Sequence, residues 1–214
     1  MYNDIRTYSK DEELIASRRR HIAKCAAHLF VKRGYDSTSV REIAEACDMS
    51  MGSLYRYIGT KEDILYLVME QGLSKFLGFC DSVDANTNAI SPSKSLQQAI
   101  RKFYRVIDDI QDVVLFSYQE TKNLEPEAQQ RIFDLDGQVV AVFERLLAKG
   151  CETGDFKIHN VTMVAHDIVA IGGMWAARRW FLRKCCTLEE YIKEHSELIL
   201  RAICQNKIAI KSTK

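Results

Sequence analysis

Ser50-Met51-Gly52-Ser53-Leu54-Tyr55-Arg56-Tyr57-Ile58 is the most informative stretch of this sequence. Ser50 can cap a short helix by accepting a hydrogen bond from the freed amide of Ser53. Leu54 and Ile58 are four residues apart, so both can face inward. The other positions are then expected near the outside: Met51, Gly52, Ser53, Tyr55, Arg56 and Tyr57. A face with hydroxyls, phenols and a guanidinium fits a helix pressed against phosphates and base edges.

The next four residues, Thr60-Lys61-Glu62-Asp63, predict the start of another helix. Thr60 can cap it, and Lys61 lies in its first turn, where freed amides also favour a phosphate. The whole chain has a net charge of only +1. Residues 17–61, however, contain nine Lys or Arg and four Asp or Glu. The basic surface is therefore predicted to be a local patch, with a slightly acidic remainder.

The residues ahead of this stretch complete a recognisable supersecondary unit. Apolar residues recur on one face from Arg18 to Arg33, which predicts a helix that Gly34 ends. Ser39 and Glu42 have the spacing of a capping box that opens a short second helix. A turn then leads to the helix after Ser50. Two short helices behind a longer supporting helix form a helix-turn-helix unit, whose last helix lies in the major groove of DNA.

Residues 18–66 resemble the DNA-binding domain of TetR-family (tetracycline-repressor-like) regulators. Two stretches carry the resemblance: Ala27-x-Leu29-Phe30-x-x-x-Gly34-Tyr35-x-x-Thr38-Ser39-Val40-x-x-Ile43-Ala44 and Ser50-x-Gly52-x-Leu54-Tyr55-x-Tyr57-Ile58-x-x-Lys61-x-x-Ile64-Leu65. The family often has His-Phe where Tyr57-Ile58 stand, and a tyrosine still offers a phosphate donor. The resemblance implies base contacts from Arg41, Met51 and Ser53, with Gly52 between them permitting close approach to the bases. It implies phosphate contacts from Thr38, Tyr55, Tyr57 and Lys61. Ser39, Ser50 and Arg56 complete the predicted DNA-binding set.

The rest of the chain predicts an all-α protein, because it has only 2 prolines and 10 glycines and little β-branched alternation. We expect an N-terminal arm at 1–17, the helix-turn-helix domain at 18–66 with a connecting helix to about 80, a larger helical domain at 81–206 and a tail at 207–214. Within the larger domain we expect helices at 95–122, 127–149, 161–186 and 187–204, the last opened by a capping box at Thr187. By resemblance, the larger domain dimerises through the last two helices and holds a small effector. The pair Gly172-Gly173 would allow close backbone approach.

The sequence predicts a cytoplasmic protein without a membrane partner. No apolar run approaches the ~18 residues that span a bilayer, and the polar N-terminus does not resemble a secretory signal. Seven cysteines without a Cys-x-x-Cys pair fit reduced thiols better than a disulfide framework. We found no metal-ligand spacing among the histidines and no catalytic motif, so we expect no cofactor, no metal and no enzyme activity.

Residues 175–184 (Trp-Ala-Ala-Arg-Arg-Trp-Phe-Leu-Arg-Lys) are the predicted effector region. They combine clustered guanidinium groups with aromatic rings, and guanidinium groups suit bidentate phosphate binding. The stretch resembles the branch of the family that senses acyl-CoA thioesters. The acyl part would lie among Phe103, Phe116, Tyr118 and Trp175, and the phosphates would meet Arg178, Arg179 and Arg183. The alternative is that Trp180 packs in the dimer seam and the cations simply favour a helix C-terminus.

Taken together, these features predict a homodimeric, ligand-responsive transcriptional repressor that binds a near-palindromic site in double-stranded DNA and leaves it when a small effector such as an acyl-CoA binds. Three alternatives stay open. The protein could instead regulate efflux in response to a hydrophobic drug-like molecule. The larger domain could be a thioester-processing enzyme carrying a relic DNA-binding module. The chain could also be an architectural DNA binder without an effector.

Overall fold

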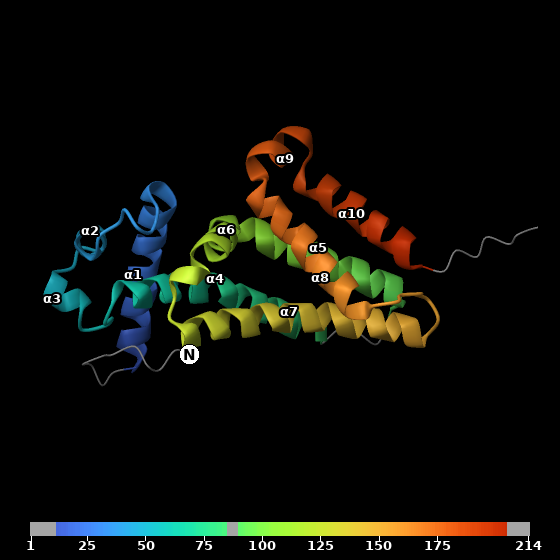
Figure 1. Cartoon of the computed structure of the whole chain (residues 1–214), viewed down its shortest axis with the longest axis horizontal. Coiled ribbons are helices and arrows are strands. Elements are labelled where there is room, and N and C mark those ends of the chain that lie inside the picture. Colours follow the sequence, from blue (N-terminus) through green and yellow to red (C-terminus); the bar gives the residue numbers. More distant parts are fainter. Residues whose placement is uncertain (1–11, 85–89, 205–214) are drawn as a thin grey trace, which may run out of the picture. The chain divides into compact units, whose positions relative to one another are not determined.

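The computed structural model describes residues 12–84 and 90–204, and these are almost entirely helical (Figure 1). The one strand-like feature among them is an isolated antiparallel bridge between Phe156 and Cys204. The prediction of an all-α protein is therefore confirmed. The predicted tail at 207–214 and most of the predicted arm lie outside the described residues. None of the described helices is both long enough and apolar enough to cross a membrane.

The chain divides into two compact units. The first contains residues up to Lys75 together with Ile110–Leu135, and the second contains Phe76–Asp109 and the residues from Asp136 onward. The long helices α4 (Lys61–Asp84) and α7 (Pro126–Glu152) contribute to both units.

In the first unit, α1 (Glu12–Arg33) supports two short helices, α2 (Val40–Ala46) and α3 (Met51–Leu54). The unit also includes α6 (Gln111–Glu120) and the short 3-10 helix η1 (Thr121–Asn123). Its core is built from aliphatic side chains and stacked rings. Phe30 lies 5.2 Å from the Tyr35 ring and 5.4 Å from the Phe116 ring, centroid to centroid. The positive φ of +84° at Gly34 lets the chain leave α1, as predicted for a helix-ending glycine.

The second unit is organised around α5 (Pro92–Asp109), which packs against α8 (Val161–Ala177) and α10 (Leu188–Ile203). Phe103 on α5 is the centre of its core, with ring centroids of Phe79 and Phe143 both 5.4 Å away. A Cβ on Gly172 of α8 would lie 2.8 Å from Tyr104 and 2.9 Å from Phe103. The close approach predicted for the glycine pair is therefore made, at Gly172, within the chain and against α5.

Four predicted helix extents were wrong. The first helix begins at Glu12, six residues before Arg18. The predicted helix at 95–122 begins at Pro92 and is broken at Ile110, where φ is −123° and ψ is 28°. The predicted helix at 161–186 is likewise broken, into α8 and α9 (Arg179–Cys185), by non-helical dihedrals at Arg178. A single residue with such dihedrals interrupts the backbone hydrogen bonds of a helix. No residue type in the sequence indicates where this happens.

The fourth error concerns the helix predicted at 127–149, because the residue that follows this range, Gly150, does not end the helix. Helix α7 runs through it to Glu152, and the chain turns at Gly154 with φ +76°. Gly150 is needed for another reason: a Cβ there would overlap the ring of buried Phe156. The cap predicted at Thr187 is confirmed, since its hydroxyl and the Glu190 carboxylate form both bonds of a capping box.

Candidate nucleic-acid interface and effector region

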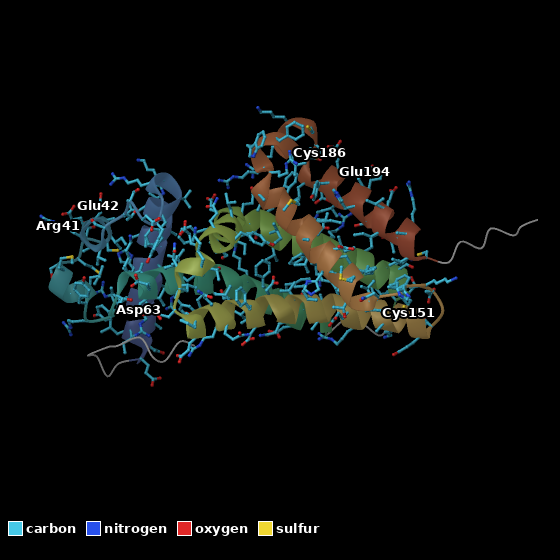
Figure 2. All side chains as sticks on the ribbon, in the orientation of Figure 1. Arg41, Glu42, Asp63, Cys151, Cys186 and Glu194 are labelled. Atoms are coloured by element: carbon cyan, nitrogen blue, oxygen red, sulfur yellow. The ribbon has the colours of Figure 1, made fainter. Side chains whose placement is uncertain are left out.

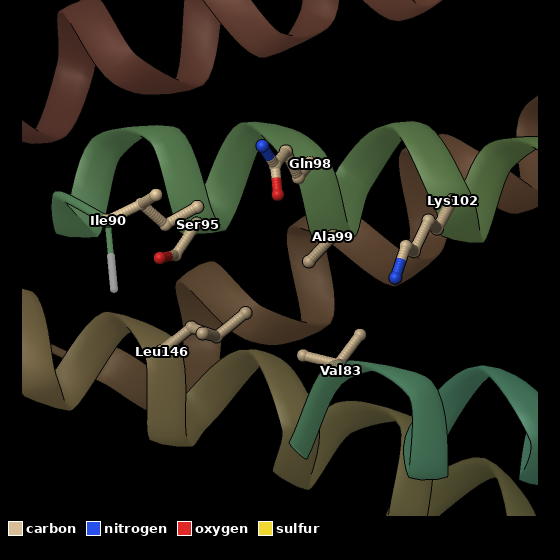
Figure 3. Close-up of a pocket in the computed structure, with 7 residues that line it drawn as sticks. All are labelled: Val83, Ile90, Ser95, Gln98, Ala99, Lys102 and Leu146. Carbon is tan, nitrogen blue, oxygen red and sulfur yellow. The ribbon is translucent and has the colours of Figure 1, made fainter. Parts of the chain in front are cut away.

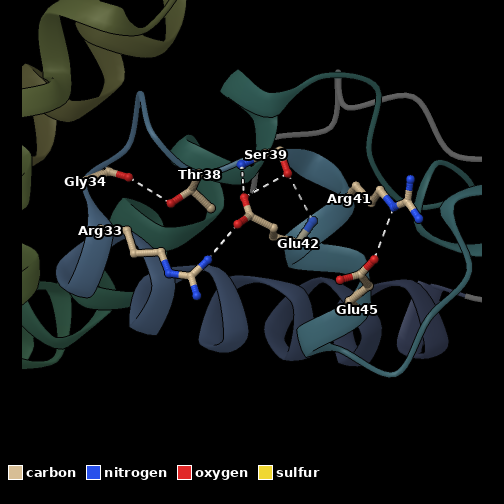
Figure 4. A network of polar contacts seen from close by, with 7 residues as sticks. All are labelled: Arg33, Gly34, Thr38, Ser39, Arg41, Glu42 and Glu45. Carbon is tan, nitrogen blue, oxygen red and sulfur yellow. Dashed lines mark hydrogen bonds and ion pairs between the residues drawn. The ribbon is translucent and has the colours of Figure 1, made fainter.

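Helix α2 is held at its start by the predicted capping box (Figure 4). The Glu42 amide donates to Ser39 Oγ at 3.2 Å, and the Ser39 amide donates to Glu42 Oε2 at 2.8 Å. The hydrogen bonds from the Ser39 backbone and side chain lower the pKa of the Glu42 carboxyl. Arg33, in the last turn of α1, donates to Glu42 Oε1 at 2.6 Å. This exposed pair connects the end of α1 to the first turn of α2.

The turn between α2 and α3 uses left-handed backbone. Asp48 has φ +53°, a region that Asp tolerates better than most residues. Ser50 then caps α3 by accepting from the Ser53 amide at 3.1 Å, as predicted. The α-helix itself is short, and after Leu54 the chain tightens, with the Tyr57 amide donating to Leu54 O at 2.9 Å. Leu54 and Ile58 are fully buried, which confirms the predicted inner face.

The outward side of α3 is the best candidate for contact with bases. Met51 and Tyr55 are 36% and 41% exposed, Gly52 and Arg56 are also exposed, and Ser53 is half-buried. No atom lies within 4 Å of where a Cβ on Gly52 would stand. The free protein therefore does not need a glycine at this position, whereas a helix pressed into a groove gains from its small size.

Arg41 projects from α2 and is well exposed (Figures 2 and 4). Its Nε donates to Glu45 Oε1 at 3.1 Å, one helical turn along. An exposed pair of this kind contributes only ~0.3–0.5 kcal/mol. A bidentate contact with guanine is worth ~1–3 kcal/mol, so Arg41 can exchange the pair for a base edge at small cost.

Two residues predicted to contact phosphates are buried. Tyr57 is only 5% exposed, because the tightened turn after Leu54 rotates its ring into the core, and its carbonyl accepts from Arg19 Nε at 3.0 Å. The prediction that Tyr57 is exposed was therefore wrong. Thr38 is 1% exposed, and its hydroxyl donates to Gly34 O at 2.8 Å. That hydroxyl already stabilises the end of α1, and a phosphate contact would have to break its hydrogen bond to Gly34 O.

Lys61 is also engaged within the protein. Its Nζ donates to Tyr35 O at 2.7 Å and to Asp36 O at 3.4 Å, and it lies 4.2 Å from the centroid of the Tyr35 ring. The predicted cap beside it is confirmed. The Asp63 amide donates to Thr60 Oγ1 at 3.1 Å, and the Thr60 amide donates to Asp63 Oδ2 at 2.9 Å. A role of Lys61 at phosphates stays a prediction, and such a contact would compete with the Tyr35 carbonyl.

The residues predicted to hold an effector are distributed over both compact units. Phe116 belongs to the first unit, where it stacks on Phe30, and Tyr118 of the same unit is 64% exposed. Phe103 and Trp175 belong to the second unit and are almost fully buried. Within that unit the Trp175 indole donates from Nε1 to Asp108 Oδ1 at 2.7 Å.

The predicted cations surround the break between α8 and α9. Arg178 is the residue at the break, and its guanidinium carbon lies 5.8 Å from the centroid of the Phe181 ring. Arg183 Nη2 lies 3.7 Å from Asp108 Oδ1, the same oxygen that accepts from Trp175. Because α8 ends at Ala177, Trp175 lies on a different helix from Arg179, although both were expected within one helix at 161–186. Trp180 is 65% exposed within this chain.

A recess in the second unit was not predicted (Figure 3). Its cavity volume is about 20 Å³, and Lys102 is its charged residue. The lining residues come from α4, α5, α7 and the segment before α5: Val83, Ile90, Ser95, Gln98, Ala99, Lys102 and Leu146. Only the tertiary fold brings these helices together, so no sequence pattern could have indicated the recess.

Comparison with known proteins agrees with this geometry. Residues 22–66 match the profile of the family described as "Bacterial regulatory proteins, tetR family", and residues 89–203 match the profile "Tetracyclin repressor-like, C-terminal domain". The second match alone covers more than half of the chain. The chain belongs to the TetR family. Proteins of this family regulate transcription by binding operator DNA as dimers and respond to small-molecule ligands, and this chain is a DNA-binding regulator of that kind.

Individual relatives in the TetR family are similar over most of the chain. HTH-type transcriptional regulator HbdR from Aromatoleum sp. (strain CIB) is 26% identical, covering 89% of this chain and 82% of its own. A TetR-family regulatory protein from Rhodococcus RHA1 is 27% identical, with a TM-score of 0.77 over 86% of this chain and 95% of its own. AibR, solved with isovaleryl coenzyme A and operator DNA, shares the fold at 24% identity, with a TM-score of 0.72 over 85% of this chain and 97% of its own.

Proposed function

We propose that this protein is an operator-binding repressor that an acyl-CoA, or a similarly long amphipathic anion, releases from DNA. The observation that carries the DNA-binding part is the capped helix-turn-helix. Ser50 caps α3, buried Leu54 and Ile58 anchor it, and Met51, Tyr55 and Arg56 stand on its outer side. Two such helices in a dimer would reach two half-sites about one helical turn apart, ~34–36 Å.

The composition of the second unit supports the choice of effector. Buried rings around Phe103 offer an apolar environment, while Arg178, Arg179 and Arg183 offer guanidinium groups for phosphates at the α8–α9 break. The fold is shared with AibR, which was solved with a coenzyme A thioester and operator DNA. Phe116 and Tyr118 remain predicted contacts with less support, since the first is packed on Phe30 in the other unit.

Release from DNA would follow from a shift between two conformations. Ligand pockets that bury a drug-sized molecule enclose ~300–1,000 Å³, whereas the recess beside Lys102 has a cavity volume of only about 20 Å³. This recess is too small for an acyl chain, so we expect the second unit to open when the effector binds. An effector that binds the open form more tightly shifts the population toward it, and DNA binding weakens by the same coupling free energy.

A gel-shift titration of the operator complex tests the effector. Acyl-CoA should release the protein, whereas free fatty acid and coenzyme A alone, each offering half of the contacts, should be much weaker. The double variant Arg178→Ala/Arg179→Ala should bind DNA normally and lose the response. Arg201→Ala is a control for the loss of an exposed guanidinium group from the same unit, because Arg201 is exposed on α10 and pairs with Glu197.

The outcomes separate the proposal from its alternatives. Release by none of the three ligands, or a normal response of the double variant, would refute the acyl-CoA assignment and favour an uncharged hydrophobic effector. Turnover of the thioester in the same mixture would favour the enzyme alternative. We propose binding without catalysis because the relatives are transcriptional regulators. We also propose a cytoplasmic location, where a bacterial regulator meets its operator.

We further propose that α8 and α10 form the dimer interface. Large apolar side chains are exposed on both helices: Met163 is 57%, Met174 44% and Leu198 60% exposed in the single chain. Exposed apolar groups concentrated on neighbouring helices mark an interaction surface. Leu198→Glu should therefore weaken association in analytical ultracentrifugation, while Leu14→Glu on α1, 39% exposed, should not.

A further inference from the structure

Three side chains with metal-ligand atoms converge inside the DNA-binding unit: His21, Cys25 and Cys47. His21 and Cys25 stand one turn apart on the same face of α1, and Cys47 is the C-cap residue of α2. The ligand atoms of all three lie within 4.8 Å of one another. The separation between Cys25 Sγ and His21 Nε2 is 4.0 Å.

These separations are close to those of a tetrahedral metal centre. With Zn–S bonds of ~2.3 Å and Zn–N bonds of ~2.0–2.1 Å, tetrahedral angles place neighbouring ligand atoms roughly 3.5–3.8 Å apart. The ligand atoms, now within 4.8 Å of one another, therefore need to approach by no more than about 1.3 Å, which side-chain torsions can supply. His21 Nε2, which lies 3.1 Å from Cys47 O, would exchange that carbonyl for the cation.

We propose that His21, Cys25 and Cys47 form a binding site for a thiophilic d¹⁰ cation, Zn²⁺ or Cu⁺. Two thiolates and an imidazole are ligands that both ions prefer over the hard cations Mg²⁺ and Ca²⁺. Three protein ligands leave a fourth position for water or a small thiol. Exposed His21 and half-buried Cys25 provide the entry path, while buried Cys47 closes the inner side.

The position of the site gives it a consequence for DNA binding. Cys47 directly precedes Asp48, whose φ of +53° makes the turn, and α3 begins only four residues after Cys47. A cation held by α1 and Cys47 would fasten this turn to the supporting helix. The metal-bound protein should therefore hold α3 in one orientation and bind its operator with an altered affinity, in either direction. This effect is separate from effector binding in the second unit.

The test begins with metal binding to the full-length protein, kept reduced by a phosphine. Titration of Zn²⁺ against a chromophoric chelator should show one tight site per chain, and Cu⁺ in a second titration should occupy the same site. Co²⁺ should give the ligand-field bands of a tetrahedral centre with thiolate charge transfer. Excess Mg²⁺ should not compete. These readouts do not depend on knowing the operator.

Variants then assign the site. Cys25→Ser and His21→Ala change exposed or half-exposed positions, so both variants should fold. Each should weaken Zn²⁺ binding more than about 100-fold, because the loss of an outer-shell partner of a metal ligand alone costs ~10–100-fold in metal affinity. Cys185→Ser/Cys186→Ser is the matched control. It removes two adjacent thiols from the end of α9, and it should leave the tight site intact.

The results that would overturn the proposal are equally specific. One is Zn²⁺ binding to the unaltered protein that is no tighter than to Cys25→Ser. The others are loss of the tight site in the Cys185/Cys186 control and a cobalt spectrum without thiolate charge transfer. A protein that binds no cation but forms a Cys25–Cys47 disulfide with peroxide would also refute it. Unchanged operator affinity at saturating Zn²⁺ would overturn the proposed effect on α3. None of these outcomes bears on the proposal that an acyl-CoA is the effector.

Discussion

The contact between α8 and α5 in the second unit is tight enough that one methyl group should disturb it. In Gly172→Ala the added Cβ would lie 2.8 Å from Tyr104 Cε1 and 2.9 Å from Phe103 Cε1. Carbon atoms prefer separations of ~3.5–4.0 Å, so the rings or the helix must move by roughly 0.6–1 Å. Both rings are almost fully buried, and the Tyr104 hydroxyl donates to Ile168 O at 3.3 Å, so neither can yield easily.

The magnitude follows from two opposing effects. Overpacking of a filled core typically costs about 1–3 kcal/mol. Alanine gains ~1 kcal/mol over glycine inside a helix. Gly137→Ala on α7 isolates the second effect, because no atom lies within 4 Å of its added Cβ. We therefore expect Gly137→Ala to be stabilised by about 0.5–1 kcal/mol, and Gly172→Ala to be less stable than it by about 1–3 kcal/mol.

Urea unfolding of both variants and the unaltered protein, at one protein concentration, measures these differences. The m-value should stay constant, which shows that the native and unfolded ensembles expose the same surface. Equal free energies of unfolding for the two alanine variants would refute the close approach of α8 to α5. The same result would remove the reason for expecting the aromatic core to be closed before an effector binds.

Three further predictions concern other parts of the molecule. Ser39→Ala should cost about 1 kcal/mol of unfolding free energy at pH 7 by removing a helix cap. Of the Ser39 hydrogen bonds that lower the pKa of the Glu42 carboxyl in the folded state, the backbone bond survives in this variant and the side-chain bond is lost. The carboxylate therefore stabilises the variant less above its ordinary pKa, and urea titrations of Ser39→Ala should show a shallower loss of stability as the pH falls through the lowered value. Trp175→Phe should destabilise the protein by at least about 1.5 kcal/mol in thermal unfolding, since it leaves the Asp108 carboxylate without its indole donor at 2.7 Å, while Arg201→Ala should change little. Footprinting should show two near-palindromic half-sites ~34–36 Å apart, and protection of a single asymmetric half-site would contradict a two-fold dimer.

The local signals in the sequence were sufficient for the helix-turn-helix unit. Caps at Ser39, Ser50 and Thr187 were predictable because a hydroxyl side chain bonds an amide two or three residues away, and this geometry needs no other part of the chain. The inner face of α3 was predictable for a related reason, since Leu54 and Ile58 follow the helical period. The motif spacing then identified the family, which the matched profiles confirm.

Tertiary packing decided which side chains from distant parts of the sequence lie in contact. Tyr57 follows the same exposed sequence pattern as Tyr55, yet a tightened turn buries it. Phe116 appeared available for an effector, but its nearest ring is Phe30, 86 positions earlier in the chain. The breaks at Ile110 and Arg178 arise from backbone dihedrals that packing imposes on residues without special conformational preference.

The cluster of His21, Cys25 and Cys47 shows the same division most clearly. The i, i+4 spacing of His21 and Cys25 is visible in the sequence, but a pair alone does not specify a site. Cys47, the C-cap residue of α2, joins them only because α1 packs against α2. Local hydrogen bonding and helical periodicity act over a few residues and can be inferred from the sequence, whereas side chains from distant segments meet only when the hydrophobic core brings their helices together.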